Sequence, residues 1–146
     1  MRFELHNNEP TTEQMNFRPF QAFLRLLGKL NGKLSLEDRK ELAGNPNTPP
    51  ETLTILARDK VWDVRWRVAY NSNTPPETLT ILARDEKWRV RYEVAENPNT
   101  PPEILTILAR DKDGDVRLGV ERNLNATREI VQTVRAYEFY KEQPTL

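Results

Sequence analysis

The chain has no cysteine and only one histidine, His6, among its 146 residues. Without cysteine it has no disulfide, thiolate metal site, cysteine-held cluster or thiol nucleophile. The one histidine lies in a terminus without a clear pattern, so there is no material for a Ser–His–Asp triad or a multi-histidine metal site. The composition therefore predicts no cofactor and no metal, and we expect a protein that is not an enzyme.

Long apolar runs and an excess of one charge are missing as well. No run is long enough to cross a bilayer, and the first residues lack the basic-then-apolar order of a secretory signal. Lys and Arg total 22, and Asp and Glu also total 22, with no basic tail. Non-specific attraction to phosphate backbones is therefore not favoured. We expect one cytoplasmic domain without membrane contact.

The sequence does contain a repeat of 26 residues. Three closely similar copies span Asn45–Tyr70, Asn71–Glu96 and Asn97–Arg122, and a fourth begins at Asn123 and decays. A fixed period of this length is typical of a solenoid, in which each unit contacts its neighbours and the array presents an extended surface. One copy alone buries too little apolar surface to offset the conformational entropy lost on folding, so the copies must stack.

Each copy predicts a first helix that begins at Thr48, Pro49, Pro50 and Glu51. We interpret these four residues as a capping box, with the prolines at the first helical positions. The same four residue types recur at 74–77 and 100–103. The apolar stripe of this helix consists of Leu53, Leu56 and Ala57, widened by Ile55.

A second, shorter segment follows after a polar link. Asp63 is its expected N-cap, and Val64 and Val68 share a face. Asn71 is expected to end it in the left-handed conformation that asparagine tolerates. The segment is short enough to be α or 3₁₀, and the periodicity does not decide between them.

Two sets of polar residues recur at the same period. The asparagines are expected to form a ladder of side-chain to backbone hydrogen bonds at the turns. The charged residues are expected to form a ladder of surface ion pairs, with an anion site as the alternative, because stacking brings like charges within about 10 Å of one another. The first set is Asn45, Asn71, Asn97 and Asn123, and the second is Arg65, Arg91 and Arg117 with Asp59, Asp85 and Asp111.

The two ends depart from the repeat and are expected to cap the stack. Residues 12–44 comprise an apolar helix at 17–30 and a half-repeat at 34–45, with Ser35 as its N-cap. Residues 45–122 hold the three repeats, and residues 123–146 a degenerate repeat and a helix that runs on to Pro144. We therefore predict a single domain over residues 1–146.

Three motifs of the first copy, NPNTP, LTILARD and VRWRVAYN, resemble the leucine-rich repeat variant (LRV) family over roughly residues 34–135. The resemblance implies an all-α, right-handed, HEAT-like solenoid of α and 3₁₀ segments without a sheet, and suggests that the shorter segment is the 3₁₀ one. A family member with an iron–sulfur cluster holds it through N-terminal cysteines. Since this chain has none, the resemblance implies the fold and no cofactor.

When the copies are aligned, they differ mainly at the link and at certain positions of the second segment. Equivalent positions of the aligned copies form a column. If that segment is α-helical, its aromatic residues lie at i, i+4 and i+8, away from the core, and arginines lie beside them. Trp, Tyr and Arg dominate interface hot spots, which predicts a partner-binding face. The alternative is that the aromatic rings pack against a neighbouring repeat or a terminal helix. The candidate residues are Trp62, Trp66, Arg67, Tyr70, Trp88, Arg89 and Tyr92.

We therefore expect a non-catalytic interaction module that binds a protein or peptide partner. One alternative is a nucleic-acid-binding helical repeat, because such columns can stack bases and follow phosphates, although the balanced charge argues against it. Another is a non-catalytic accessory subunit of an enzyme complex. Self-association as a homodimer is a further alternative, and the sequence does not identify the partner.

Overall fold

The computed structural model describes residues 34–141, so the helix predicted at 17–30 lies outside the described residues. Over this range the chain forms α-helices and no strand. The helices are α3 (Leu36–Gly44), α4 (Pro50–Leu56), α5 (Trp62–Tyr70), α6 (Pro76–Leu82), α7 (Trp88–Glu96), α8 (Pro102–Leu108), α9 (Gly114–Arg122) and α10 (Arg128–Lys141).

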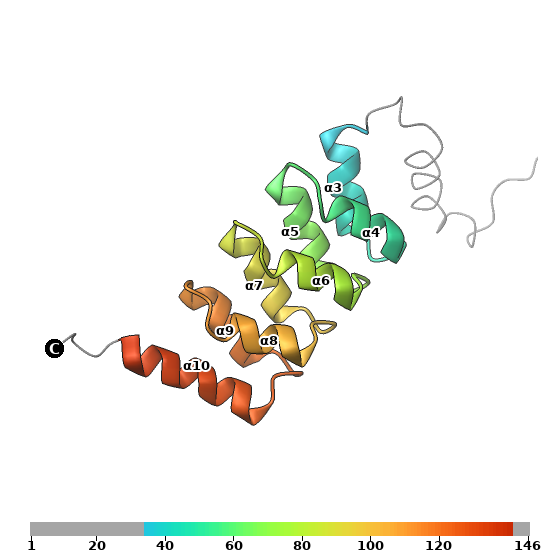
Figure 1. Cartoon of the computed structure of the whole chain (residues 1–146). Helices are drawn as coiled ribbons and strands as arrows, with labels where there is room; N and C mark the ends of the chain where they lie inside the picture. Colours follow the sequence, from blue (N-terminus) through green and yellow to red (C-terminus); the bar gives the residue numbers. More distant parts are fainter. Residues whose placement is uncertain (1–33, 142–146) are drawn as a thin grey trace, which may run out of the picture.

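The helices form two rows (Figure 1). One row consists of α3, α5, α7 and α9, which pack side by side, and the other consists of α4, α6 and α8. Each helix of the second row packs on its neighbours in the first, and α10 lies against α8 and α9 at the end of the stack. The predicted all-α solenoid with a 26-residue unit is confirmed.

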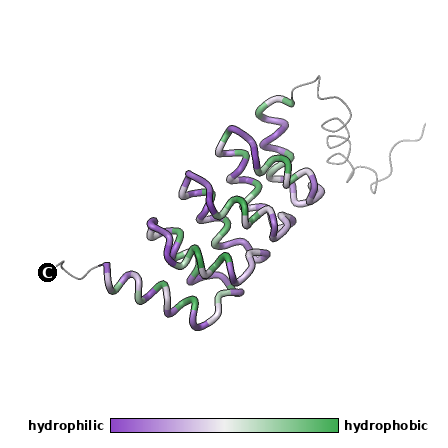
Figure 2. The backbone as a smooth tube through the Cα atoms, viewed as in Figure 1, coloured by the Kyte–Doolittle hydropathy of each residue, from purple (hydrophilic) through white to green (hydrophobic). Residues whose placement is uncertain are grey.

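The core lies between the two rows. Leu53 and Leu56 of α4 face Val64 and Val68 of α5, all of them buried, and the equivalent residues repeat this layer in each unit. Figure 2 shows hydrophilic stretches recurring at the loops and hydrophobic ones within the helices. The expectation for Ile55 is wrong, because 43% of its surface is exposed. Helix α4 buries Thr52, Leu53 and Leu56, and within residues 34–141 the side that carries Ile55 is left open.

The first helix of each repeat begins at the prolines as predicted, but the capping box does not form. Pro49 is the N-cap residue and makes no side-chain cap hydrogen bond. The buried hydroxyl of Thr48 instead donates to the carbonyl oxygen of Leu42 at 2.6 Å. That carbonyl lies in the last turn of α3, where it also accepts from the N–H of Asn45 at 3.3 Å. Thr48 therefore ties the end of one helix to the start of the next, while Ser35 caps α3 as predicted.

The second segment of each repeat is an α-helix of nine residues, longer than the seven-residue first helix. Both the prediction that it is the shorter segment and the implied 3₁₀ geometry are wrong for these repeats. Val61 is the N-cap of α5, and Asp63 lies inside its first turn. Asn71 ends the helix as predicted but is extended, with φ −67° and ψ 122°, and its backbone N–H donates to the carbonyl oxygens of Arg67 and Val68 without a left-handed turn.

The asparagine ladder is confirmed. The side-chain amide of Asn71 donates to the carbonyl oxygens of Ala43 and Asn45, at 2.9 and 2.8 Å, both in the preceding unit. Asn97 and Asn123 make the same pair of bonds one and two units further on. Each repeat therefore satisfies carbonyl groups at the end of the helix before it.

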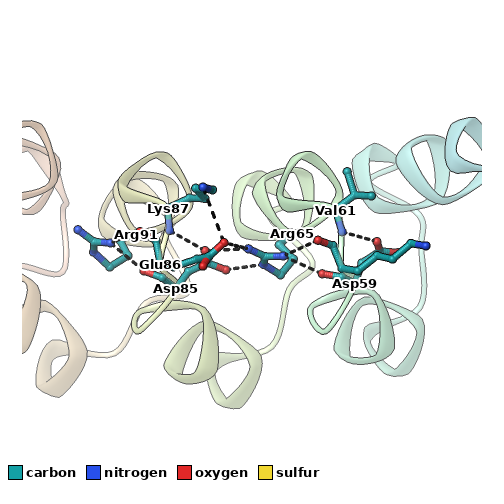
Figure 3. Close-up of polar contacts among 8 residues, drawn as sticks. Asp59, Val61, Arg65, Asp85, Glu86, Lys87 and Arg91 are labelled. Atoms are coloured by element: carbon teal, nitrogen blue, oxygen red, sulfur yellow. Dashed lines mark hydrogen bonds and ion pairs between the residues drawn. The ribbon is translucent and has the colours of Figure 1, made fainter.

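The ion-pair ladder is also confirmed, and Figure 3 shows part of it. Arg91 donates to the carboxylate of Asp111 in the next repeat at 2.7 Å and to the carbonyl oxygen of Asp85 at 2.7 Å. Only 7% of the Arg91 side chain is exposed, so the pairs are more buried than the predicted surface pairs. The ladder continues into α10, where Glu138 accepts from Arg117. These guanidinium groups already hold carboxylates, so they do not form an anion site.

Candidate functional site

The core packing of α5 and α7 determines which of their side chains face outward. Helix α5 buries Val64, Val68 and Ala69, and its Trp62 and Tyr70 are 37% and 66% exposed. Helix α7 buries the equivalent residues one repeat later. Trp66, Trp88 and Tyr92 are partly buried, and Arg89 is exposed. Trp62 and Tyr70 therefore lie on the outer face of this row, as helical periodicity predicts, whereas Trp66, Trp88 and Tyr92 also pack against the core.

A groove of about 380 Å³ runs between α5 and α7 on that face. Equivalent positions of two consecutive repeats form its walls, so the groove exists only where the repeats stack. It is lined by Trp62, Asp63, Trp66, Trp88, Arg89, Tyr92 and Glu93. Five of the seven predicted site residues are among them.

The other two predicted residues lie beside the groove and contact residues that line it. The Tyr70 ring stacks on the Trp66 ring with 5.9 Å between centroids and 15° between planes. The Arg67 guanidinium lies 3.7 Å from the carboxylate of Asp63. Tyr70 and Arg67 therefore support the wall of α5.

Two acidic residues in the groove, Asp63 and Glu93, were not predicted as site residues. The indole Nε1 of Trp66 donates to Oε1 of Glu93 at 3.0 Å, which joins the two repeats across the groove. Asp63 pairs with Lys40 of α3 at 3.2 Å. Glu93 occupies the position equivalent to Arg67 one repeat later. The change from a positive to a negative residue at this position is visible when the copies are compared and could have marked Glu93 as a site residue.

Electrostatics set Glu93 apart from its neighbours. Burial raises the pKa of its carboxyl group, the charge of Glu96 adds to this, and the hydrogen bond from Trp66 opposes it. Arg89 lies four residues before Glu93 on the same helix, a spacing at which ion pairs form. Its guanidinium instead lies 4.6 Å from the centre of the Trp88 ring. Tyr92 donates to Glu96 at 2.6 Å.

Other kinds of site are not seen in the part of the chain that the structure describes. Within residues 34–141 no group of three or more His, Asp or Glu side chains is placed to hold a metal ion. None of the helices in this range is both long and apolar enough to cross a membrane. A second groove of about 310 Å³ lies between α8 and α10, lined largely by Thr and Glu side chains without an aromatic ring.

Two rows of short helices with a 26-residue period define an α-helical repeat solenoid. The family model described as leucine rich repeat variant matches residues 62–87 and 88–113. The chain therefore carries leucine rich repeat variant repeats, which confirms the resemblance of its motifs. Each matched unit begins at a tryptophan that lines the groove, so the groove spans the junction of the two units. No curated protein and no solved structure matches the chain.

Proposed function

We propose that this protein is a non-catalytic interaction module that binds a protein or peptide partner through the groove between α5 and α7. The observation that carries the proposal is that five predicted site residues from two repeats line one groove. Leucine rich repeat variant repeats are generally protein-interaction modules, which supports this class of function. The five residues are Trp62, Trp66, Trp88, Arg89 and Tyr92.

Contacts within the groove favour binding by restricting its side chains before a partner arrives. Trp66 is held by its hydrogen bond to Glu93 and by the Tyr70 ring. Arg89 is held over the Trp88 ring. Side chains that are already ordered lose less rotamer entropy on association, a cost of about 0.5–1.5 kcal/mol for each rotamer-rich side chain. Large aromatic rings in such positions are the usual anchors of an interface.

Nucleic acid is a less favoured ligand for this groove. Asp63 and Glu93 both line it, and their carboxylates oppose the approach of a phosphate backbone. Arg89 is the only basic residue among the lining residues. The groove thus agrees with the balanced charge of the whole chain.

Affinity purification with matched variants tests the proposal. The groove variant is Trp62→Ala with Trp88→Ala, and the control is Ile81→Ala with Ile107→Ala, which shortens two exposed apolar side chains on α6 and α8. A specific protein should be retained by the wild type and the control and lost with the groove variant. Its affinity, measured by calorimetry, should fall at least about tenfold, since hot-spot truncations cost about 2 kcal/mol or more.

Circular dichroism and thermal unfolding establish that both variants are folded. Equal retention of the partner by the wild type and the groove variant contradicts the proposal. Recovery of nucleic acid in place of a protein contradicts it as well.

A further inference from the structure

We propose that the partner inserts a basic side chain, arginine or lysine, into the groove, where it pairs with Glu93 and contacts the tryptophan rings. This inference rests on the proposed function and names the chemistry of the partner. It depends on three features of the groove: a carboxylate without a cation, neighbouring carboxylates that already have one, and aromatic walls.

Glu93 is a partly buried carboxylate whose bonding is incomplete. Its Oε1 accepts the hydrogen bond from Trp66 at 3.0 Å, and Oε2 has no hydrogen bond within residues 34–141. No lysine or arginine in this range forms an ion pair with it. The Trp66 bond fixes the orientation of the carboxylate and leaves one oxygen for another donor. A charge-assisted bond from a partner would offset the burial that raises the pKa of Glu93.

The neighbouring carboxylates already have cations from this chain. Asp63 lies 3.2 Å from Nζ of Lys40 and 3.7 Å from Nε of Arg67. Glu96 lies 3.5 Å from the guanidinium of Arg122. Glu93 is therefore the lining carboxylate that remains uncompensated in the described part of the chain. Charge complementarity at the Glu93 carboxylate therefore favours a positively charged group from the partner.

Arg89 lies four residues before Glu93 on α7, but its guanidinium does not pair with the carboxylate. Its guanidinium contacts the Trp88 ring, so the pair expected at this helical spacing is not formed. Arg89 is exposed, where water screens its charge, whereas Glu93 is partly buried, where charges interact more strongly. A cation that approaches Glu93 is therefore attracted more than Arg89 repels it.

The aromatic walls suit the same kind of group. Trp62 and Trp88 occupy equivalent positions on neighbouring helices, and packed helices lie about 8–10 Å apart. The groove of about 380 Å³ has room beside these rings for a guanidinium or an alkyl stem. The Arg89–Trp88 contact shows that a ring of this groove already takes a guanidinium. Cation–π attraction and the Glu93 charge thus favour the same ligand.

Three capped tripeptides test the inference: acetyl-Gly-Arg-Gly-amide, the same peptide with neutral citrulline in place of arginine, and acetyl-Gly-Glu-Gly-amide. Binding is followed by NMR through the indole N–H signals of Trp62, Trp66 and Trp88. The arginine peptide should move the Trp66 signal most and bind at least about tenfold more tightly than the citrulline peptide. Glu93→Gln should remove this preference.

Glu93→Gln keeps an oxygen that can accept from Trp66, so its fold should be retained, and circular dichroism checks this. The control is Glu121→Gln, which removes a carboxylate that is paired with Arg135 and does not line the groove. This control should keep the preference for arginine.

Several results overturn the inference: no binding of the arginine peptide, equal binding of citrulline, preferred binding of the glutamate peptide, or an unchanged preference in Glu93→Gln. If a purified partner is still lost with the tryptophan variant, the proposed function survives such a result. If the partner is also retained by that variant, both the inference and the proposed function are wrong.

Discussion

The side-chain amide of Asn97 lies 2.7 Å from the carbonyl oxygen of Ala69, which belongs to the last turn of a helix in the preceding repeat. That carbonyl has no partner inside its own helix, as is general for the last four carbonyls of an α-helix. Asn97 also donates to the carbonyl oxygen of Asn71 at 3.0 Å. Each helix end is therefore completed by the repeat that follows it, and the stack is stabilised as a unit.

Asn97→Ala should lower the free energy of unfolding by about 1–3 kcal/mol, because the buried carbonyl of Ala69 loses its donor and the carbonyl of Asn71 keeps only the N–H of Thr74. Urea unfolding followed by circular dichroism measures the change. The matched control is Asn45→Ala in the same column, since the side chain of Asn45 accepts only the local bond from the N–H of Asn47. Equal losses in the two variants would show that the bonds between repeats are not the cause.

Asp111→Asn should reduce how strongly the free energy of unfolding depends on pH in the acidic range. Burial opposes ionisation of Asp111, but the bonds from Arg91 and from the N–H of Asp113 prevail, and the pKa of this carboxyl lies below its ordinary value. Its charge thus stabilises the fold above the unfolded pKa, and that stability is lost as pH falls through the folded pKa. Wild type should lose more stability than the variant below about pH 4.

Urea unfolding at a series of pH values measures this difference. At neutral pH the variant should be the less stable protein, because Arg91 loses a charged partner. Parallel curves for the wild type and the variant would contradict the prediction.

Glu93→Gln should raise thermal stability at neutral pH, whereas Asp111→Asn should lower it. Burial raises the pKa of Glu93, so its charged form opposes folding at pH values above its ordinary pKa. The variant should have the higher Tm at pH 7 and the same Tm as the wild type below about pH 3, where the carboxyl is protonated in both states. Glu77→Gln on the exposed surface of α6 is the control and should leave Tm unchanged at both pH values.

Gly119→Ala should destabilise the protein although alanine favours a helix by about 1 kcal/mol over glycine. A Cβ at this position would lie 3.0 Å from the Cβ of Ala95 and 3.3 Å from the Cγ of Glu96, where α9 packs on α7. Ala95 is rigidly attached to its helix, so relief requires the helices to separate. Gly114→Ala meets only the end of the Arg117 side chain at 3.4 Å and should not destabilise. Thermal unfolding compares the two variants, and a stabilised Gly119→Ala would contradict this view of the contact.

Local patterns predicted the helices and much of the core. Leu53 and Val64 are buried where the periodicity places them, and the prolines mark the helix starts. One failure occurred where a side chain had two potential partners. Thr48 could bond within its own helix or to Leu42, and the tertiary contact prevailed because it satisfies a buried carbonyl group. Ile55 lies on the outer side of its row, which no periodicity within one helix reveals.

The sequence by itself determined that the chain is a stack of helical repeats, since similar segments must bury similar faces and only neighbouring copies cover them. It also determined which columns vary between copies. The tertiary structure alone decided that these columns form a groove with a carboxylate in it. Trp66 and Glu93 are 27 positions apart and belong to different repeats, so their contact depends on how two units pack. No pattern within a single repeat contains that information.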